Sequence, residues 1–154
     1  MQLLFFRSRE EHVPGGLKNI YADLMALNYA KLKKNTFIIT LFPTALERFE
    51  EARDIVFRNT NVIYEKAVEL NKYGPFNFIR TLYDGEEWAG NWQVGFQGLV
   101  SKVNQCYNRQ GPTYVFLVEM DNFEKLREIK ENIRALYNVG NHSVHINDYH
   151  EETL

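Results

Sequence analysis

The sequence is 154 residues long, which fits a single domain, and 45% of its residues are hydrophobic and 25% charged, as in globular rather than disordered chains. Its formal net charge of -2 gives no general attraction to nucleic acid or anionic lipid, so an anionic ligand would need a local group of cations. A single cysteine, Cys106, excludes an intrachain disulfide, and the N-terminal residues lack the order of a signal peptide. We expect a cytoplasmic domain with no nucleic-acid partner and no membrane partner.

Residues 1–34 predict a strand, a loop and a helix. Residues 2–6 are apolar enough for a strand, and Pro14-Gly15-Gly16 then breaks the chain. After this break apolar residues recur at helical spacing, at Leu17, Ile20, Leu24 and Leu27. We treat residues 1–34 as an N-terminal extension and residues 35–154 as the main domain.

Two strands with a helix between them are predicted next. Residues 36–42 form an apolar and β-branched run that Pro43 closes, which is typical of a buried strand. Thr44 and Glu47 have capping-box spacing and predict a helix as far as Arg58. Residues 62–70 alternate in polarity, which indicates a second strand with one wetter face.

The stretch that follows predicts two helices separated by a glycine-rich loop. Gly74-Pro75 begins a short helix, and Asp84-Gly85 ends it. Glycines and tryptophans interrupt the next residues, so we expect a loop that leads into a helix over residues 96–107.

Residues 114–118 predict another strand, and Asp121 or Asn122 can cap a helix over residues 123–136. Residues 143–146 predict the last strand.

The end of the sequence suggests one more helix. Asp148 and Glu151 have capping-box spacing, but Leu154 follows too soon for a stable helix, so we expect a truncated last helix. From residue 36 onward few strands are linked by helices. This order favours an α+β fold of the ferredoxin-like kind, an antiparallel sheet with helices packed on one face. The alternative is a small open α/β sheet that includes residues 2–6.

Three histidines lie close together near the C-terminal end, namely His142, His145 and His150. Imidazoles are good metal ligands, but neighbouring side chains of a strand alternate, so His142 and His145 should project to opposite faces, and we assign no metal ligand. A second interpretation makes His145 a hydrogen-bonded core residue. A third places it at a strand end beside a helix N-terminus opened by Asp148, where a phosphate would be favoured.

The third interpretation matches a known pattern. Gly140, Val144, His145, Asp148 and Glu151 stand in the order found in the phosphohistidine segment of nucleoside diphosphate kinases, which residues 140–153 therefore resemble. The resemblance extends thinly over residues 36–153, and it implies that His145 is the catalytic nucleophile.

Other segments suggest how a nucleotide would be held. Ile133-Arg134-Ala135 looks like the family's segment whose Arg contacts phosphate, and Gly74-Pro75-Phe76 resembles the segment whose Phe stacks on the base. Arg127, Lys130 and Arg134 recur at helical spacing, which would aim cations at one phosphate, although such a row is also typical of a solvated face. Asn147 stands in place of the family's Ser after the catalytic His. The expected substrate-binding residues are thus Arg134, Phe76, Lys130, Arg127 and Asn147.

The resemblance implies a nucleotide phosphotransferase in which His145 takes the terminal phosphate from a nucleoside triphosphate and returns it to a diphosphate, with Mg²⁺ bound to the nucleotide. Nucleoside di- and triphosphates are the implied partners, and a homo-oligomer is left open. Phe42 stands where the family has a phosphate-binding Lys before its Pro, and Arg134 lies only a short way before His145. The alternatives are therefore an inactive nucleotide-binding module or a partner-docking segment of a larger protein.

Overall fold

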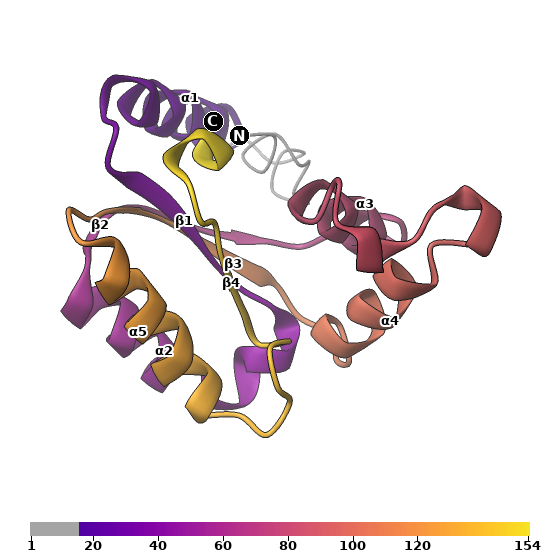
Figure 1. Ribbon diagram of the computed structural model, residues 1–154. Coiled ribbons are helices and arrows are strands. Elements are labelled where there is room, and N and C mark those ends of the chain that lie inside the picture. The colour runs from indigo at the N-terminus through magenta and orange to yellow at the C-terminus, as the bar shows by residue number, and fades with distance from the viewer. Residues whose placement is uncertain (1–15) are drawn as a thin grey trace.

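A computed structural model describes residues 16–154 (Figure 1). In this part of the chain four strands form one antiparallel sheet with the spatial order β2-β3-β1-β4. The strands are β1 (Thr36–Leu41), β2 (Asn61–Val68), β3 (Thr113–Glu119) and β4 (Val144–Ile146). Because β3 pairs antiparallel with both β1 and β2, it lies between two strands of the same direction. This split βαβ arrangement confirms the predicted ferredoxin-like α+β fold. The strand expected over residues 2–6 lies outside the described residues.

Strand β1 is completely buried and provides the frame for β4. Its residues pair with β3 on one side and, over its second half, with β4 on the other. Thr40 lies directly opposite His145, and Ile39 lies opposite Ile146. Since side chains alternate along each strand, Thr40 and His145 share one face of the sheet while Ile39 and Ile146 share the other.

Helices α2 (Phe49–Asn59) and α5 (Phe123–Ala135) cover the face of Ile39 and Ile146, as expected for the two helices of this fold (Figure 1). Ala52 and Val56 of α2 and Ile133 of α5 are fully buried against it. Helix α5 begins at Asn122, whose side chain accepts hydrogen bonds from the backbone N–H groups of the first turn, so one of the two predicted caps is confirmed.

Helices α1 (Gly16–Leu32), α3 (Gly74–Leu82) and α4 (Gln97–Cys106) cover the opposite face, so this sheet carries helices on both sides (Figure 1). The 3-10 turns Glu87–Ala89 and Trp92–Val94 connect α3 to α4. Gly98 of α4 lies so close to this connection that an added Cβ would be 1.8 Å from the backbone oxygen of Trp88. The α3–α4 insert is therefore packed tightly onto itself.

A buried ion pair ties α1 to the sheet. The Nζ atom of Lys66 in β2 lies 2.6 Å from a carboxylate oxygen of Asp23, and the hydroxyl of Tyr64 donates to the other oxygen. Asp23 and Lys66 are both buried. The helix within the predicted N-terminal extension thus packs on the main sheet.

Both predicted capping boxes are wrong. The segment after β1 is a 3-10 helix, Pro43–Arg48, and the Thr44 hydroxyl donates to the backbone oxygen of Gln105 at 2.7 Å instead of capping a helix. After β4 the chain forms only a 3-10 turn, His150–Thr153, and the N–H of Asp148 is bonded by Glu152 rather than by Glu151. No long helix N-terminus therefore faces His145 from this side.

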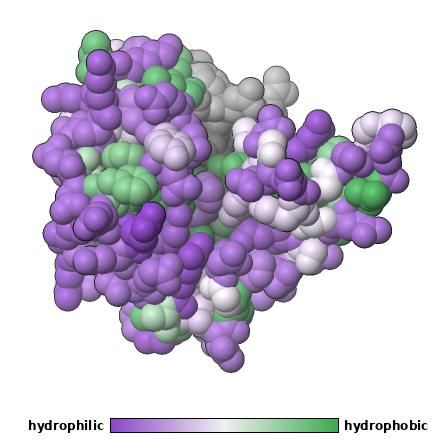
Figure 2. All heavy atoms as spheres, in the orientation of Figure 1, coloured by the Kyte–Doolittle hydropathy of each residue, from purple (hydrophilic) through white to green (hydrophobic). Residues whose placement is uncertain are grey.

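The surface is mainly hydrophilic in the orientation of Figure 2, including the outer sides of α2 and α5. Among the described helices none combines the length and apolar composition that crossing a bilayer requires.

Candidate functional site

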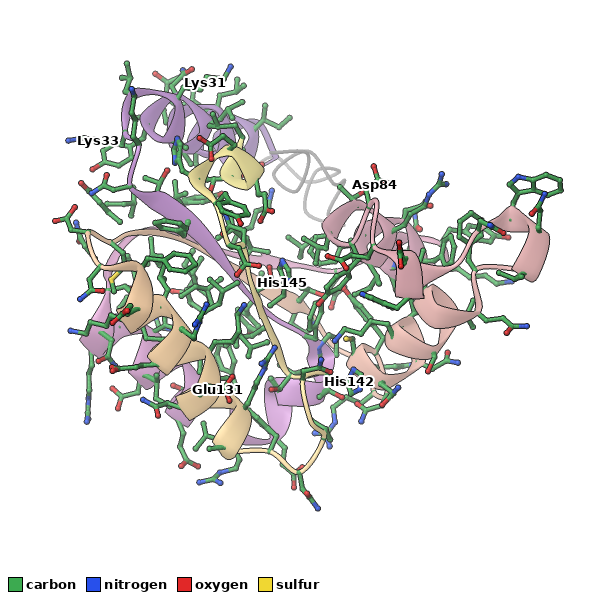
Figure 3. The ribbon with its side chains drawn as sticks, in the orientation of Figure 1. Lys31, Lys33, Asp84, Glu131, His142 and His145 are labelled. Carbon is green, nitrogen blue, oxygen red and sulfur yellow. The ribbon has the colours of Figure 1, made fainter. Side chains whose placement is uncertain are left out.

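His145 is the middle residue of β4, the short strand at one edge of the sheet. Val144 and Ile146 point into the core beneath α5, so the imidazole points to the other face, towards the α3–α4 insert. Figure 3 shows His145 between α5 and the insert, with His142 further down the same segment. The residue is largely buried, with a small part of its surface exposed.

Tyr83, at the end of α3, holds one side of the imidazole. Its hydroxyl lies 3.2 Å from Nδ1 of His145, and the two rings meet edge to face with centroids 5.1 Å apart. The Tyr83 ring is itself fixed against Trp88, 5.0 Å between centroids. Burial raises the pKa of the Tyr83 hydroxyl, so it stays a neutral phenol at physiological pH. Nε2 of His145 makes no hydrogen bond with the described residues.

The imidazole of His145 is held in its neutral form. Burial, and to a lesser extent the positive charges of Lys130, Lys102 and Arg134, lower its pKa from the ordinary value near 6.5 to about 3. A histidine that is neutral throughout the physiological range keeps a lone pair on one ring nitrogen. The group can therefore act as a nucleophile or as a neutral hydrogen-bond partner.

The three cations around His145 come from two helices. Lys130 and Arg134 lie one turn apart on α5 and are partly buried, and each has a carboxylate neighbour: Asp148 at 3.6 Å from Lys130 and Glu131 at 3.1 Å from Arg134. Lys102 comes from α4 and is only 5% exposed. These positive charges make the surroundings of His145 favourable for an anion.

Buried polar atoms without a partner concentrate at the same place. Within residues 16–154 four buried side-chain atoms lack a hydrogen bond: Thr40 Oγ1, Arg134 Nε, His142 Nδ1 and Ser143 Oγ. Thr40 pairs with His145 across the strands, and His142 and Ser143 immediately precede β4. Unsatisfied buried polar groups are uncommon, because each costs about 1 to 3 kcal/mol. Their concentration beside His145 marks a polar site rather than a closed core.

The structure brings some of the sequence-predicted residues to this site. Arg134 and Lys130 are close enough to His145 to lower its pKa. Arg127 is exposed, and its guanidinium lies 6.0 Å from the ring centre of Phe123. Phe76 packs edge to face on Phe96, 5.9 Å between centroids, within the apolar cluster under the insert.

Asn147 is turned away from the site and binds the sheet. Its Oδ1 accepts the backbone N–H of Ile38 at 2.6 Å, while Nδ2 donates to the backbone oxygen of Tyr149 and to the hydroxyl of Thr153. Thr153 in turn donates to the backbone oxygen of Thr36 at 2.9 Å. The Asn147 side chain thus fixes the end of β4 to β1.

The expectation that His142 and His145 point to opposite faces rests on alternation along a strand, and β4 begins only at Val144. His142 lies before the strand, where alternation does not apply, and burial and the charges of Lys102 and Arg134 lower its pKa too. Among the residues that the structure describes, no group of three or more His, Cys, Asp or Glu side chains could hold a metal ion.

Two residues of the site were not among the predicted ones, Lys102 and Tyr83. The sequence pattern could have indicated Lys102. Leu99, Lys102 and Cys106 are three and four positions apart, so the lysine lies on the buried face of its helix. A lysine on an apolar stripe is unusual unless it serves a site. Tyr83 carries no comparable pattern, since a tyrosine at a helix end is ordinary.

No protein-family model matches the chain, and a search of curated proteins finds no significant match. Among solved structures the chain is similar to an orthorhombic crystal form, C222, of the Aquifex aeolicus nucleoside diphosphate kinase. The two chains share 15% identity with a TM-score of 0.49, over 78% of this chain and 89% of the other. We therefore base the function on the side chains of the site alone.

Proposed function

We propose that this protein is a nucleotide phosphotransferase, in which His145 accepts the terminal phosphate of a nucleoside triphosphate and passes it to a diphosphate. The observation that carries the proposal is the imidazole of His145 on β4, which Tyr83 contacts at Nδ1 and which lies among the cations of α4 and α5. A nucleophile for phosphoryl transfer needs a lone pair, and the phosphate oxygens need cations that offset their charge. Both conditions are met around one side chain.

The transfer is a balanced exchange. A ring nitrogen of His145 attacks the terminal phosphorus, and the bond from phosphorus to the bridging oxygen breaks with its electrons going to the departing diphosphate. Lys130 and Arg134 are the cations that we assign to the phosphate oxygens, and the unpartnered Nε–H of Arg134 is a ready donor. Magnesium, bound to the nucleotide, would supply further charge neutralisation.

The test is to mix the protein with ATP labelled in its terminal phosphate and to look for a phosphorylated histidine, which is labile in acid and stable in base. We expect label in the wild type and in His142→Asn, and none in His145→Asn, which should still bind ADP. If the wild type binds ADP but takes no label, the protein is a binding module and the transferase proposal is wrong. If it neither binds nor reacts, nucleotide recognition fails as well.

A further inference from the structure

Among the described residues, Lys102 differs from Lys130 and Arg134 in having no acidic partner. Among residues 16–154 no carboxylate lies within ion-pair distance of its Nζ, although the residue is only 5% exposed. Its hydrogen bonds go to the backbone oxygen of Asn141 at 2.8 Å and, more loosely, to the Asn141 side-chain oxygen at 3.4 Å. A buried ammonium without a counter-charge is costly, because desolvation of the charged form is not offset.

The position of Lys102 connects it to His145. Its Nζ lies over the ring of Tyr83, 5.4 Å from the centroid, and the hydroxyl of that tyrosine contacts Nδ1 of His145. The charge of Lys102 also lowers the pKa of both His145 and His142. Asn141 accepts hydrogen bonds from the ammonium at the turn before β4, and the ring of Tyr83 lies below it, so the position of Nζ is fixed.

The charge that Lys102 lacks is one that a phosphate would bring. Lys130 and Arg134 can be satisfied by Asp148 and Glu131 when no ligand is bound, whereas Lys102 gains a counter-ion only when an anion enters the site. Burial, and the nearby charge of Arg134, lower the pKa of Lys102, and a bound anion would reverse that shift. Binding energy is thus available at Lys102 that the unliganded protein does not use.

We propose that Lys102, in addition to Lys130 and Arg134, contacts the phosphate group being transferred, with its ammonium donating to the oxygens on the terminal phosphorus. The role of Lys102 in the transfer step rests on the proposed function of His145, whereas its role in binding a phosphate does not depend on that function. In the transfer, Lys102 gives up no proton: it holds the phosphoryl oxygens while the bond to the bridging oxygen breaks and the bond to the imidazole forms. Removing one fixed donor of this kind typically costs a factor of about 100 to 1,000 in rate.

The variant Lys102→Met tests the inference, because methionine has a similar length and no charge. Inorganic pyrophosphate is the probe for binding, measured by calorimetry on the full chain, and labelled ATP is the probe for transfer. We expect Lys102→Met to lose at least tenfold in pyrophosphate affinity and about 100-fold in the rate of histidine labelling, in line with the loss of a charge-assisted contact. Lys102→Arg should restore part of the affinity. The matched control is Lys31→Met, an exposed lysine of α1, which should change neither quantity.

Folding is measured in parallel. Since the lysine has no carboxylate partner, Lys102→Met should be as stable as the wild type or more stable, which a purely structural lysine would not allow. Lys102→Met that binds pyrophosphate as tightly as the wild type overturns the inference. If the wild type binds pyrophosphate through Lys102 but His145 takes no label, the inference about Lys102 holds and the transferase proposal is wrong. The failure of the inference and the failure of the proposed function therefore give different results.

Discussion

The buried, neutral His145 makes the stability of the protein sensitive to mild acid. In the unfolded chain its imidazole takes up a proton near pH 6.5, whereas in the folded protein burial lowers the pKa to about 3. The unfolded state therefore binds more protons over this range. The stability associated with His145 is complete above about pH 6.5 and is lost progressively as the pH falls from there towards 3.

The size of this effect follows from the two pKa values. Between about pH 8 and pH 5 the protonation of the unfolded chain lowers the free energy of unfolding by about 2 kcal/mol, since each pKa unit is worth about 1.4 kcal/mol. The figure hardly changes if the folded pKa is 4 instead of 3, because both lie well below pH 5. His142, whose pKa is also lowered, adds a loss of the same sign.

Denaturant unfolding at the two pH values, without phosphate in the buffer, measures the loss. The comparison is between the wild type and His145→Gln, which cannot take up the proton. We expect the loss in the variant to be smaller than in the wild type by about 2 kcal/mol. His142 and the carboxylates are common to both proteins and cancel. Equal losses in the two proteins would show that His145 is protonated normally in the fold, and the neutral-imidazole reasoning would be wrong.

Three further predictions concern the frame around the site. Asn147→Ala leaves the N–H of Ile38 without its acceptor and should lower the free energy of unfolding by about 2 to 4 kcal/mol, as measured with denaturant. Lys66→Met leaves the buried Asp23 carboxylate without its cation and should lower the free energy of unfolding by about 3 to 5 kcal/mol. The double variant with Asp23→Leu should recover most of this stability, and a double variant that recovers none of it would contradict the prediction. Gly98→Ala pushes a methyl group into the backbone at Trp88 and should cost about 1 to 3 kcal/mol, with a shift in tryptophan fluorescence at neutral pH.

Much of the sheet could be read from the sequence. The run over residues 36–42 and the alternation over residues 62–70 each correspond to a strand within two residues at either end, because strand signals are local. The helices of the insert and α5 were also marked by their glycine, proline and asparagine boundaries. These features depend on neighbours in the chain, which a sequence displays directly.

The parts that failed depend on contacts between distant residues. Thr44 and Glu47 have the spacing of a capping box, but the hydroxyl of Thr44 finds an acceptor at Gln105, which no local pattern reveals. Asn147 stood at a position that suggested substrate binding, and its side chain instead completes the hydrogen bonding of β1. In both cases a polar side chain satisfied a distant backbone group, which outweighs a local motif.

The long connection between β2 and β3 begins and ends at neighbouring positions of the sheet. Val68, the last residue of β2, is paired with Thr113, the first residue of β3, so the chain leaves and re-enters the sheet at neighbouring positions. A tight turn would suffice to join them, yet residues 69–112 bring in both Lys102 and Tyr83. The chain therefore connects the sheet to the insert only at the neighbouring ends of β2 and β3. Exchange or lengthening of the insert would change the surroundings of His145 without shifting the register of any strand.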